Sequence, residues 1–102
     1  MKLAVQIERF VDAHQPGWVE AEFVDAAGKR HRFLDKVPIF TINDLDATSR
    51  YPQLGHVRCE ALSESRDVHV QIVVRINTAR PDGVESTDGL SQFTVFPGQL
   101  SD

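Results

Sequence analysis

The side chains that most often bind transition metals are four histidines and one cysteine, at His14, His31, His56, His69 and Cys59. No two of the histidines have the spacing of a zinc finger or of a helical HExxH motif. His56 and Cys59 are three residues apart, an offset that points two strand residues to opposite faces. The sequence therefore predicts no metal site.

Hydroxyl and carboxylate side chains occur together in Glu85–Gly89, but this segment lacks the Gly-x-Ser-x-Gly elbow of a serine nucleophile. The same residue types build turns, because Asp, Ser and Thr bond nearby backbone amides. Cys59 lies among alternating apolar residues and is predicted to be an inert, buried thiol. The glycines are dispersed, so no phosphate loop is expected. We therefore expect a protein that is not an enzyme and has no cofactor.

Basic residues form one run, Lys29-Arg30-His31-Arg32, at a predicted hairpin tip. Arg58 and Arg75 are predicted on polar strand faces and extend this region if the sheet brings them near. Small barrels bind single-stranded nucleic acid through such basic grooves. However, the chain has 11 Lys and Arg against 15 Asp and Glu, whereas nucleic-acid binders are usually basic. A solvated turn is favoured, and nucleic-acid binding stays an alternative.

Two aromatic residues are predicted on the solvent side of their strands. Trp18 shares a face with Glu20, and Phe96 is out of phase with Phe93. Aromatic residues are enriched at binding hot spots, so one exposed patch containing both would indicate a protein partner or a homodimer. The alternative is that Trp18 covers the mouth of a barrel. The full candidate interaction surface is Trp18, Lys29, Arg30, Arg32, Arg58, Arg75 and Phe96.

A site that assembles only in three dimensions is the remaining route to an enzyme or a small-ligand carrier. The groups to inspect for it are His31, His69, Asp35 and Glu60. This interpretation requires a deep pocket that holds at least two of them.

The elements that must position these residues are mostly strands. Strict alternation of apolar residues predicts one strand over Val68–Ile76, the clearest pattern in the chain. Alternation also predicts a hairpin of Gly17–Asp25 and Arg30–Asp35, joined by a turn in which Gly28 takes a positive φ.

Further strands are predicted over His56–Leu62, Val84–Thr87 and Gln92–Phe96. Residues 2–11 fit either a strand or a helix face, and the strands that follow favour a strand. One helix is predicted over Ile42–Arg50, with Thr41 as its N-cap and Tyr51-Pro52 after its end.

About six short strands and one short helix make the predicted fold mainly β, a small antiparallel barrel or sandwich. A barrel is preferred because closure removes exposed edge strands. Its 102 residues are too few for two separate cores, so residues 1–102 form a single domain. No apolar run suits a membrane span or a signal peptide, and a single cysteine suits a reducing compartment, which together predict a cytoplasmic protein.

Two stretches, Phe33–Thr41 and Arg75–Gly89, resemble a family of short, uncharacterised bacterial proteins. Tyr51-Pro52-Gln53 and Cys59-Glu60 fit the same pattern, and the similarity covers most of the chain. The resemblance implies a small β-barrel loosely like the second domain of elongation factor Tu, and it carries no activity. Relatives are expected to have an aromatic residue in place of Asp82, and Pro-Gly in place of Leu54-Gly55.

The sequence thus predicts a non-catalytic protein-interaction module of a bacterial cytoplasm, whose partner is another protein or a second copy. One alternative is an immunity-type protein that neutralises a basic toxin, which the formal charge of −4 permits. The other is a nucleic-acid or ribosome-associated barrel. No membrane partner is expected.

Overall fold

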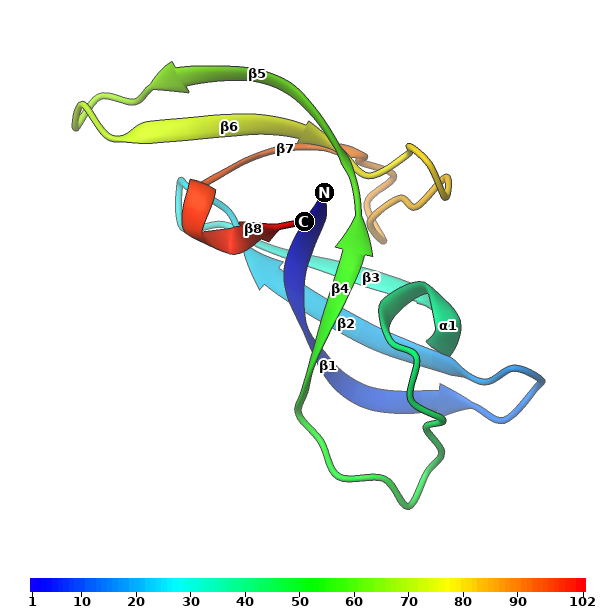
Figure 1. Cartoon of the computed structure of the whole chain (residues 1–102). Coiled ribbons are helices and arrows are strands. Elements are labelled where there is room, and N and C mark those ends of the chain that lie inside the picture. The colour runs from blue at the N-terminus through cyan, green and yellow to red at the C-terminus, as the bar shows by residue number, and fades with distance from the viewer.

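The computed structural model describes all 102 residues, which form two antiparallel β-sheets and one short helix (Figure 1). The strands are β1 (Lys2–Asp12), β2 (Trp18–Val24), β3 (Arg30–Lys36), β4 (Gln53–Arg58), β5 (Glu60–Arg66), β6 (Ile72–Asn77), β7 (Gln92–Val95) and β8 (Leu100–Ser101). The helix α1 covers Val37–Phe40, and a 3-10 turn, η1, covers Pro97–Gln99. The predicted mainly β, antiparallel class is confirmed, with eight strands rather than about six.

The larger sheet has the strand order β3-β2-β1-β4, and β8 also pairs with β1. The first half of β1, from Lys2 to Ile7, pairs with β4, and the stretch from Gln6 to Asp12 pairs with β2. The two residues of β8 pair with Lys2 and Leu3. Residues 2–11 are therefore a strand, as favoured from the sequence. The smaller sheet has the order β5-β6-β7.

The β2–β3 hairpin forms where alternation predicts it. Val19, Ala21 and Phe23 are buried on one face of β2, and Gly28 adopts a φ of +83° in the connecting turn. On β3, His31 and Phe33 are buried while their neighbours are exposed. This hairpin supplies much of the core, because a strand with one apolar face stabilises the fold by removing that face from water.

The hydrophobic core lies between the two sheets. Phe93 of the smaller sheet packs edge-on against Phe23 and Phe33 of the larger sheet, with ring centroids 5.1 and 6.0 Å apart. Hydrogen bonds also link the two layers, from Ala26 N–H in the β2–β3 turn to Thr94 O (2.9 Å) and from Thr87 N–H in the segment between β6 and β7 to Arg32 O (2.8 Å). Both layers therefore contribute to one core.

The barrel is not closed, so the preference for a closed barrel over a sandwich was wrong. The chain passes from β4 to β5 through Cys59 alone, and the β5–β6 hairpin then projects away from the larger sheet (Figure 1). No continuous ladder of strand pairing joins the sheets, and all seven residues of β5 are exposed. The short connector carries the chain into a second layer instead of extending the first one. The predicted strand over His56–Leu62 is thereby split between β4 and β5.

The strand predicted over Val68–Ile76 is wrong in its first half. Asp67 starts a tight turn, in which its backbone N–H donates to Gln71 O at 2.9 Å, and β6 begins only at Ile72. Val68 is 91% exposed instead of buried. Val74 and Ile76, the last apolar residues of the predicted pattern, are buried as expected.

The helix predicted over Ile42–Arg50 is also wrong, because the only α-helix is α1, just before it. Thr41 Oγ1 accepts the N–H of Asn43 at 3.1 Å, but no helix follows. Asp46 Oδ1 instead accepts the backbone N–H of Thr48 at 2.8 Å, which forms a local turn. The short strand predicted over Val84–Thr87 is irregular and has no strand partner. No helix is long and apolar enough to cross a membrane.

Candidate functional site

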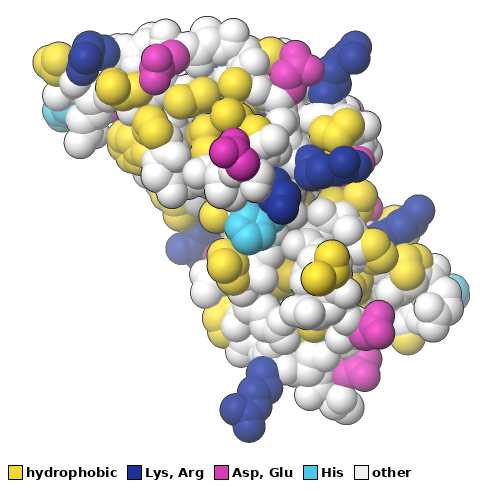
Figure 2. Space-filling view, in the orientation of Figure 1, with side chains coloured by type: hydrophobic (Ala, Val, Ile, Leu, Met, Phe, Trp, Pro, Cys, Tyr) yellow, Lys and Arg dark blue, Asp and Glu magenta, His cyan; other side chains and the backbone are white.

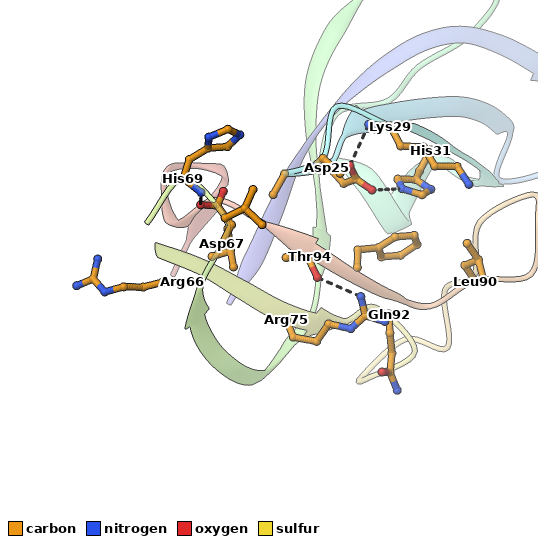
Figure 3. Close-up of a pocket in the computed structure, with 15 residues that line it drawn as sticks. Asp25, Lys29, His31, Arg66, Asp67, His69, Arg75, Leu90, Gln92 and Thr94 are labelled. Atoms are coloured by element: carbon orange, nitrogen blue, oxygen red, sulfur yellow. Dashed lines mark hydrogen bonds and ion pairs between the residues drawn. The ribbon is translucent and has the colours of Figure 1, made fainter. Parts of the chain in front are cut away.

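A groove of about 790 Å³ lies between the turns of two hairpins, beside β6 and β7 (Figure 3). One wall is the β2–β3 turn, with Asp25, Lys29 and the neighbouring His31. The opposite wall is the β5–β6 turn, and β6 and β7 supply the rest. The polar side chains in its lining are Asp25, Lys29, His31, Arg66, Asp67, His69, Arg75, Gln92 and Thr94.

Asp25 organises the first wall. Its Oδ1 accepts the backbone N–H groups of Ala27 and Lys29, both at 2.9 Å, and its Oδ2 lies 2.7 Å from His31 Nε2. Burial raises the pKa of Asp25, but the hydrogen bonds from His31, Lys29 and Ala27 outweigh burial and hold that pKa below its ordinary value. Asp25 is therefore a carboxylate, and we assign the proton on Nε2 of His31 as the one donated to it.

His31 is buried, with 4% of its side chain exposed. Its ring stacks on Phe23 at 5.2 Å and meets Phe93 edge-on at 4.7 Å between centroids. The second ring nitrogen, Nδ1, has no hydrogen-bond partner. A buried polar atom left unpaired costs about 1–3 kcal/mol, so the aromatic packing and the Asp25 bond must offset this cost. His31 thus fixes the position of Asp25, and Asp25 in turn holds the β2–β3 turn.

Asp67 organises the opposite wall in the same way. Its Oδ1 accepts the backbone N–H groups of His69 and Gln71, both at 2.9 Å. Arg66, beside it, donates from Nη1 to Val70 O at 3.1 Å. In both walls, one carboxylate oxygen of the aspartate therefore accepts two amides of its own turn.

Three cations of the groove have no acidic partner. Lys29, Arg66 and Arg75 take part in none of the ion pairs of the chain, which join other residues. Arg75 donates from Nη1 to Thr94 Oγ1 at 3.1 Å, and the β7 strand lies between this pair and the side chains of Asp25 and His31 (Figure 3). The lining thus holds these three cations beside two carboxylates, those of Asp25 and Asp67.

The other predicted basic residues, Arg30, Arg32 and Arg58, do not line this groove, and each forms an ion pair. Arg30 and Arg32 both contact Glu22, at 3.4 and 3.5 Å. Arg58 forms a two-pronged pair with Asp82, at 2.9 and 2.6 Å, and this carboxylate raises the pKa of Arg58. The predicted basic surface is thus divided. On the face shown in Figure 2, side chains of both signs are interspersed, with no broad basic field.

Trp18 and Phe96 do not form one patch. Trp18 begins β2 and pairs with Lys36, whose Nζ lies 5.8 Å from the centre of its ring. Phe96 lies near the other end of β2, where Gln99 accepts the Phe96 N–H and donates to Val24 O. Both aromatic side chains are half-buried.

Of the four groups singled out for a three-dimensional site, His31 and His69 line the groove, and Asp35 and Glu60 do not. Asp35 bonds the N–H of Lys36, and Glu60 lies beside a separate hollow with Cys59 and Arg80. Cys59 is buried, and burial raises the pKa of its thiol, which makes it a weak nucleophile. No three His, Cys, Asp or Glu side chains gather in a way that could hold a metal ion.

An apolar surface that sequence reasoning missed lies beside α1. Ile42 is fully exposed and Leu54 is 70% exposed, and both line a cleft of about 560 Å³ with Ile39 and Phe40. We call Ile39, Ile42 and Leu54 the Ile42–Leu54 surface. The sequence pattern assigned Ile42 to a helix and left Leu54 outside every predicted strand and helix, so nothing in it placed them together.

No protein-family model, no curated protein and no solved structure matches this chain. The resemblance to short bacterial proteins, and to the second domain of elongation factor Tu, stays a prediction.

Proposed function

We propose that this chain is a non-catalytic protein-interaction module of the bacterial cytoplasm, which associates through the Ile42–Leu54 surface. The observation that carries the proposal is the complete exposure of Ile42 next to a cleft with an apolar floor. Covering an isoleucine or leucine side chain contributes about 1.5–3 kcal/mol, so a partner that covers both residues gains a substantial part of its binding energy there.

The surroundings of this surface support an interface. Lys2, His56 and the Arg58–Asp82 pair edge the cleft, while Phe40 is buried beneath it. An apolar centre with a polar rim is the usual arrangement of protein–protein interfaces. Arg58, one of the residues predicted from the sequence, thus belongs to the rim.

The partner that fits this surface is a second copy of the chain. The surface presents both a projecting side chain, Ile42, and a cleft beside it. In a two-fold contact, each copy offers the same patch, so Ile42 of one copy can enter the cleft of the other. Neither copy needs a feature that the other lacks.

Sedimentation velocity over a range of protein concentrations tests this. We expect the wild-type protein to dimerise as concentration rises, and the variant carrying Ile42→Ser and Leu54→Ser to remain a monomer. Val68→Ser, which changes an equally exposed apolar residue at the far hairpin, is the matched control and should dimerise like the wild type. A wild-type monomer at every concentration, or a dimer that survives the double substitution, would refute the proposed contact.

A further inference from the structure

The outer edge of β5 is a free edge of the smaller sheet. β5 pairs with β6 on one side only, and all seven of its residues are exposed. Outside that ladder, no backbone–backbone hydrogen bond of the protein involves a residue of β5. Figure 1 shows this edge at the outer margin of the molecule. The edge therefore offers unpaired backbone N–H and C=O groups to an added strand.

The other outer strands of the two sheets are engaged. β3 and β7 each accept an N–H group from a loop, that of Thr87 at 2.8 Å and that of Ala26 at 2.9 Å. β4 lines the cleft beside the Ile42–Leu54 surface. Proteins usually guard a free edge with Pro, Lys or a bulge. β5 contains neither Pro nor Lys, and its one irregularity is the register shift between Ala61 and Ser63.

The regular part of this edge is Ser63–Arg66, which pairs residue for residue with β6. The N–H of the next residue, Asp67, donates to Gln71 O at 2.9 Å, so it points toward the β6 side of the hairpin. The backbone groups of successive residues alternate in direction along an antiparallel strand. The two serines of the regular part therefore direct their N–H and C=O groups toward β6, whereas Glu64 and Arg66 direct theirs toward solvent.

The side chains at these two positions set what an added strand must carry. Glu64 and Arg66 lie on one face of β5, and neither takes part in an ion pair. Opposite charges that face each other across neighbouring antiparallel strands stabilise the pairing. An antiparallel strand therefore matches this edge when an acidic residue faces Arg66 and a basic residue faces Glu64. Along the added strand, the order is acidic residue, any residue, basic residue.

A flexible segment of another protein fits this edge better than a second copy of β5. A second copy carries the two charges in the matching order. Its strand is held, however, between the register shift before Ser63 and the turn that begins at Asp67, so only Glu64–Arg66 of each copy can lie opposite one another. A flexible segment can also follow the irregular start of β5, and it forms a longer ladder.

We propose that β5 binds an extended segment of a partner protein as an added antiparallel strand, with an acidic residue of the segment opposite Arg66 and a basic residue opposite Glu64. The backbone groups of β5 supply affinity, and the two charges set the direction and register of the segment. The inference does not depend on the Ile42–Leu54 surface, because the cleft there shares no residue with β5.

Chemical-shift titration of the ¹⁵N-labelled protein with two capped peptides tests the proposal. One peptide is Thr-Val-Glu-Val-Arg-Val-Thr, and the other, Thr-Val-Arg-Val-Glu-Val-Thr, has the same composition with its charges exchanged. We expect saturable shifts of the β5 amides with the first peptide. The second should bind about fivefold more weakly, because it either sets like charges opposite Glu64 and Arg66 or binds as a less stable parallel strand.

Two variants of β5 sharpen the test. Glu64→Arg and Arg66→Glu together exchange the charges of the edge at constant net charge, and they should reverse the preference between the peptides. Glu64→Pro removes an N–H group that faces solvent rather than β6, so it should abolish binding of both peptides. The amide spectrum of each variant shows whether it remains folded, and the exchanged variant alone decides the matter if the proline variant does not.

The protein carrying Ile42→Ser and Leu54→Ser should bind the first peptide as the wild type does, which separates this site from the proposed dimer contact. The proposal fails if neither peptide gives saturable shifts of the β5 amides, or if the exchanged variant keeps the original preference. It also fails if the β5 amides of the Ile42→Ser and Leu54→Ser protein shift with protein concentration alone, because a second copy is then the occupant of the edge.

Discussion

The two turns that form the walls of the groove have the same backbone hydrogen bonds, but they differ in the residue at the position that adopts a left-handed conformation. In Asp25–Lys29 and in Asp67–Gln71, the first N–H donates to the fifth carbonyl, and the fourth N–H donates to the first carbonyl. In both, the aspartate side chain accepts the third and fifth N–H groups. The fourth residue is left-handed in each, but it is Gly28 in the first turn and Val70 in the second, with φ of +83° and +62°.

This difference shows that the aspartate, rather than the glycine, defines the turn. A left-handed conformation costs a residue with a side chain about 1–2 kcal/mol, and more for a β-branched one, whereas glycine adopts it freely. The second turn keeps its shape despite Val70, because Asp67 still satisfies two amides. The first turn has a further bond, from His31 to Asp25, which the second lacks.

The largest expected effect on stability is the loss on replacing Asp25, which should exceed the loss on replacing Asp67. Asp25→Ala should lower the free energy of unfolding by about 3 kcal/mol, because it removes two amide acceptors and leaves buried His31 without a partner. Asp67→Ala should lower it by only about 1 kcal/mol, the usual value of a lost cap. Urea unfolding followed by tryptophan fluorescence measures both. Equal losses would show that the Asp25–His31 bond adds nothing.

A smaller loss of stability is expected when Gly28 of the first turn is replaced by valine, the residue at the same position of the second turn. Gly28→Val should cost about 1–2 kcal/mol net, because it forces a β-branched residue to a positive φ, while the reduced freedom of the unfolded chain offsets part of that strain. Nothing lies within 4 Å of a Cβ built at Gly28, so steric crowding adds no further cost. Gly98→Val, at a glycine with similar open space and no positive φ, is the control and should cost much less. A similar loss at both positions would contradict the backbone explanation.

The reverse change should stabilise the protein. Val70→Gly relieves the left-handed strain, but it also frees the unfolded chain, so we expect a net gain of about 0.5 kcal/mol. Val68→Gly, in the same turn but without a positive φ, should instead destabilise the protein slightly. Thermal unfolding of the two variants, side by side, measures the difference. A loss of stability with Val70→Gly would show that the valine side chain has contacts that outweigh the strain.

The smallest effect concerns pH. Because the pKa of Asp25 is lowered in the folded protein, its contribution is present above the ordinary carboxyl range and is lost as pH falls through that lowered pKa. Burial acts in the opposite direction to the hydrogen bonds on this pKa. The stability difference between wild type and Asp25→Asn should therefore shrink on acidification, as measured by urea unfolding at a series of pH values. A difference that is independent of pH would contradict this assignment.

The same turns explain what the sequence could predict of the fold. The β2–β3 hairpin was predictable because Gly28 marks its turn and Val19, Ala21 and Phe23 alternate before it. The β5–β6 turn was not, because Val68 and Val70 continue the alternation of β6 through a turn that Asp67 alone specifies. The helix predicted after Thr41 failed for a related reason, since Asp46 and Thr48 satisfy each other locally.

The candidate sites depend on contacts between segments far apart in the sequence. Lys29 and Arg75 were predicted as interaction residues, and both line the groove because the β2–β3 turn packs beside β7. Arg30 and Arg32 were predicted with them, yet both pair with the single carboxylate of Glu22, which offsets one of their two charges. Periodicity reports which face of a strand is apolar, and it does not report which strands of the other sheet lie beside it.

The central position of β1 has a consequence for folding kinetics. Its partners, β2, β4 and β8, lie at increasing distances along the chain, out to Ser101. Contacts between distant residues form slowly, because a long loop must close before they stabilise anything. We expect the β2–β3 and β5–β6 hairpins to form early, as local units. The rate-limiting step is then the docking of β4 on the first half of β1, and β8 adds its two-residue pairing last.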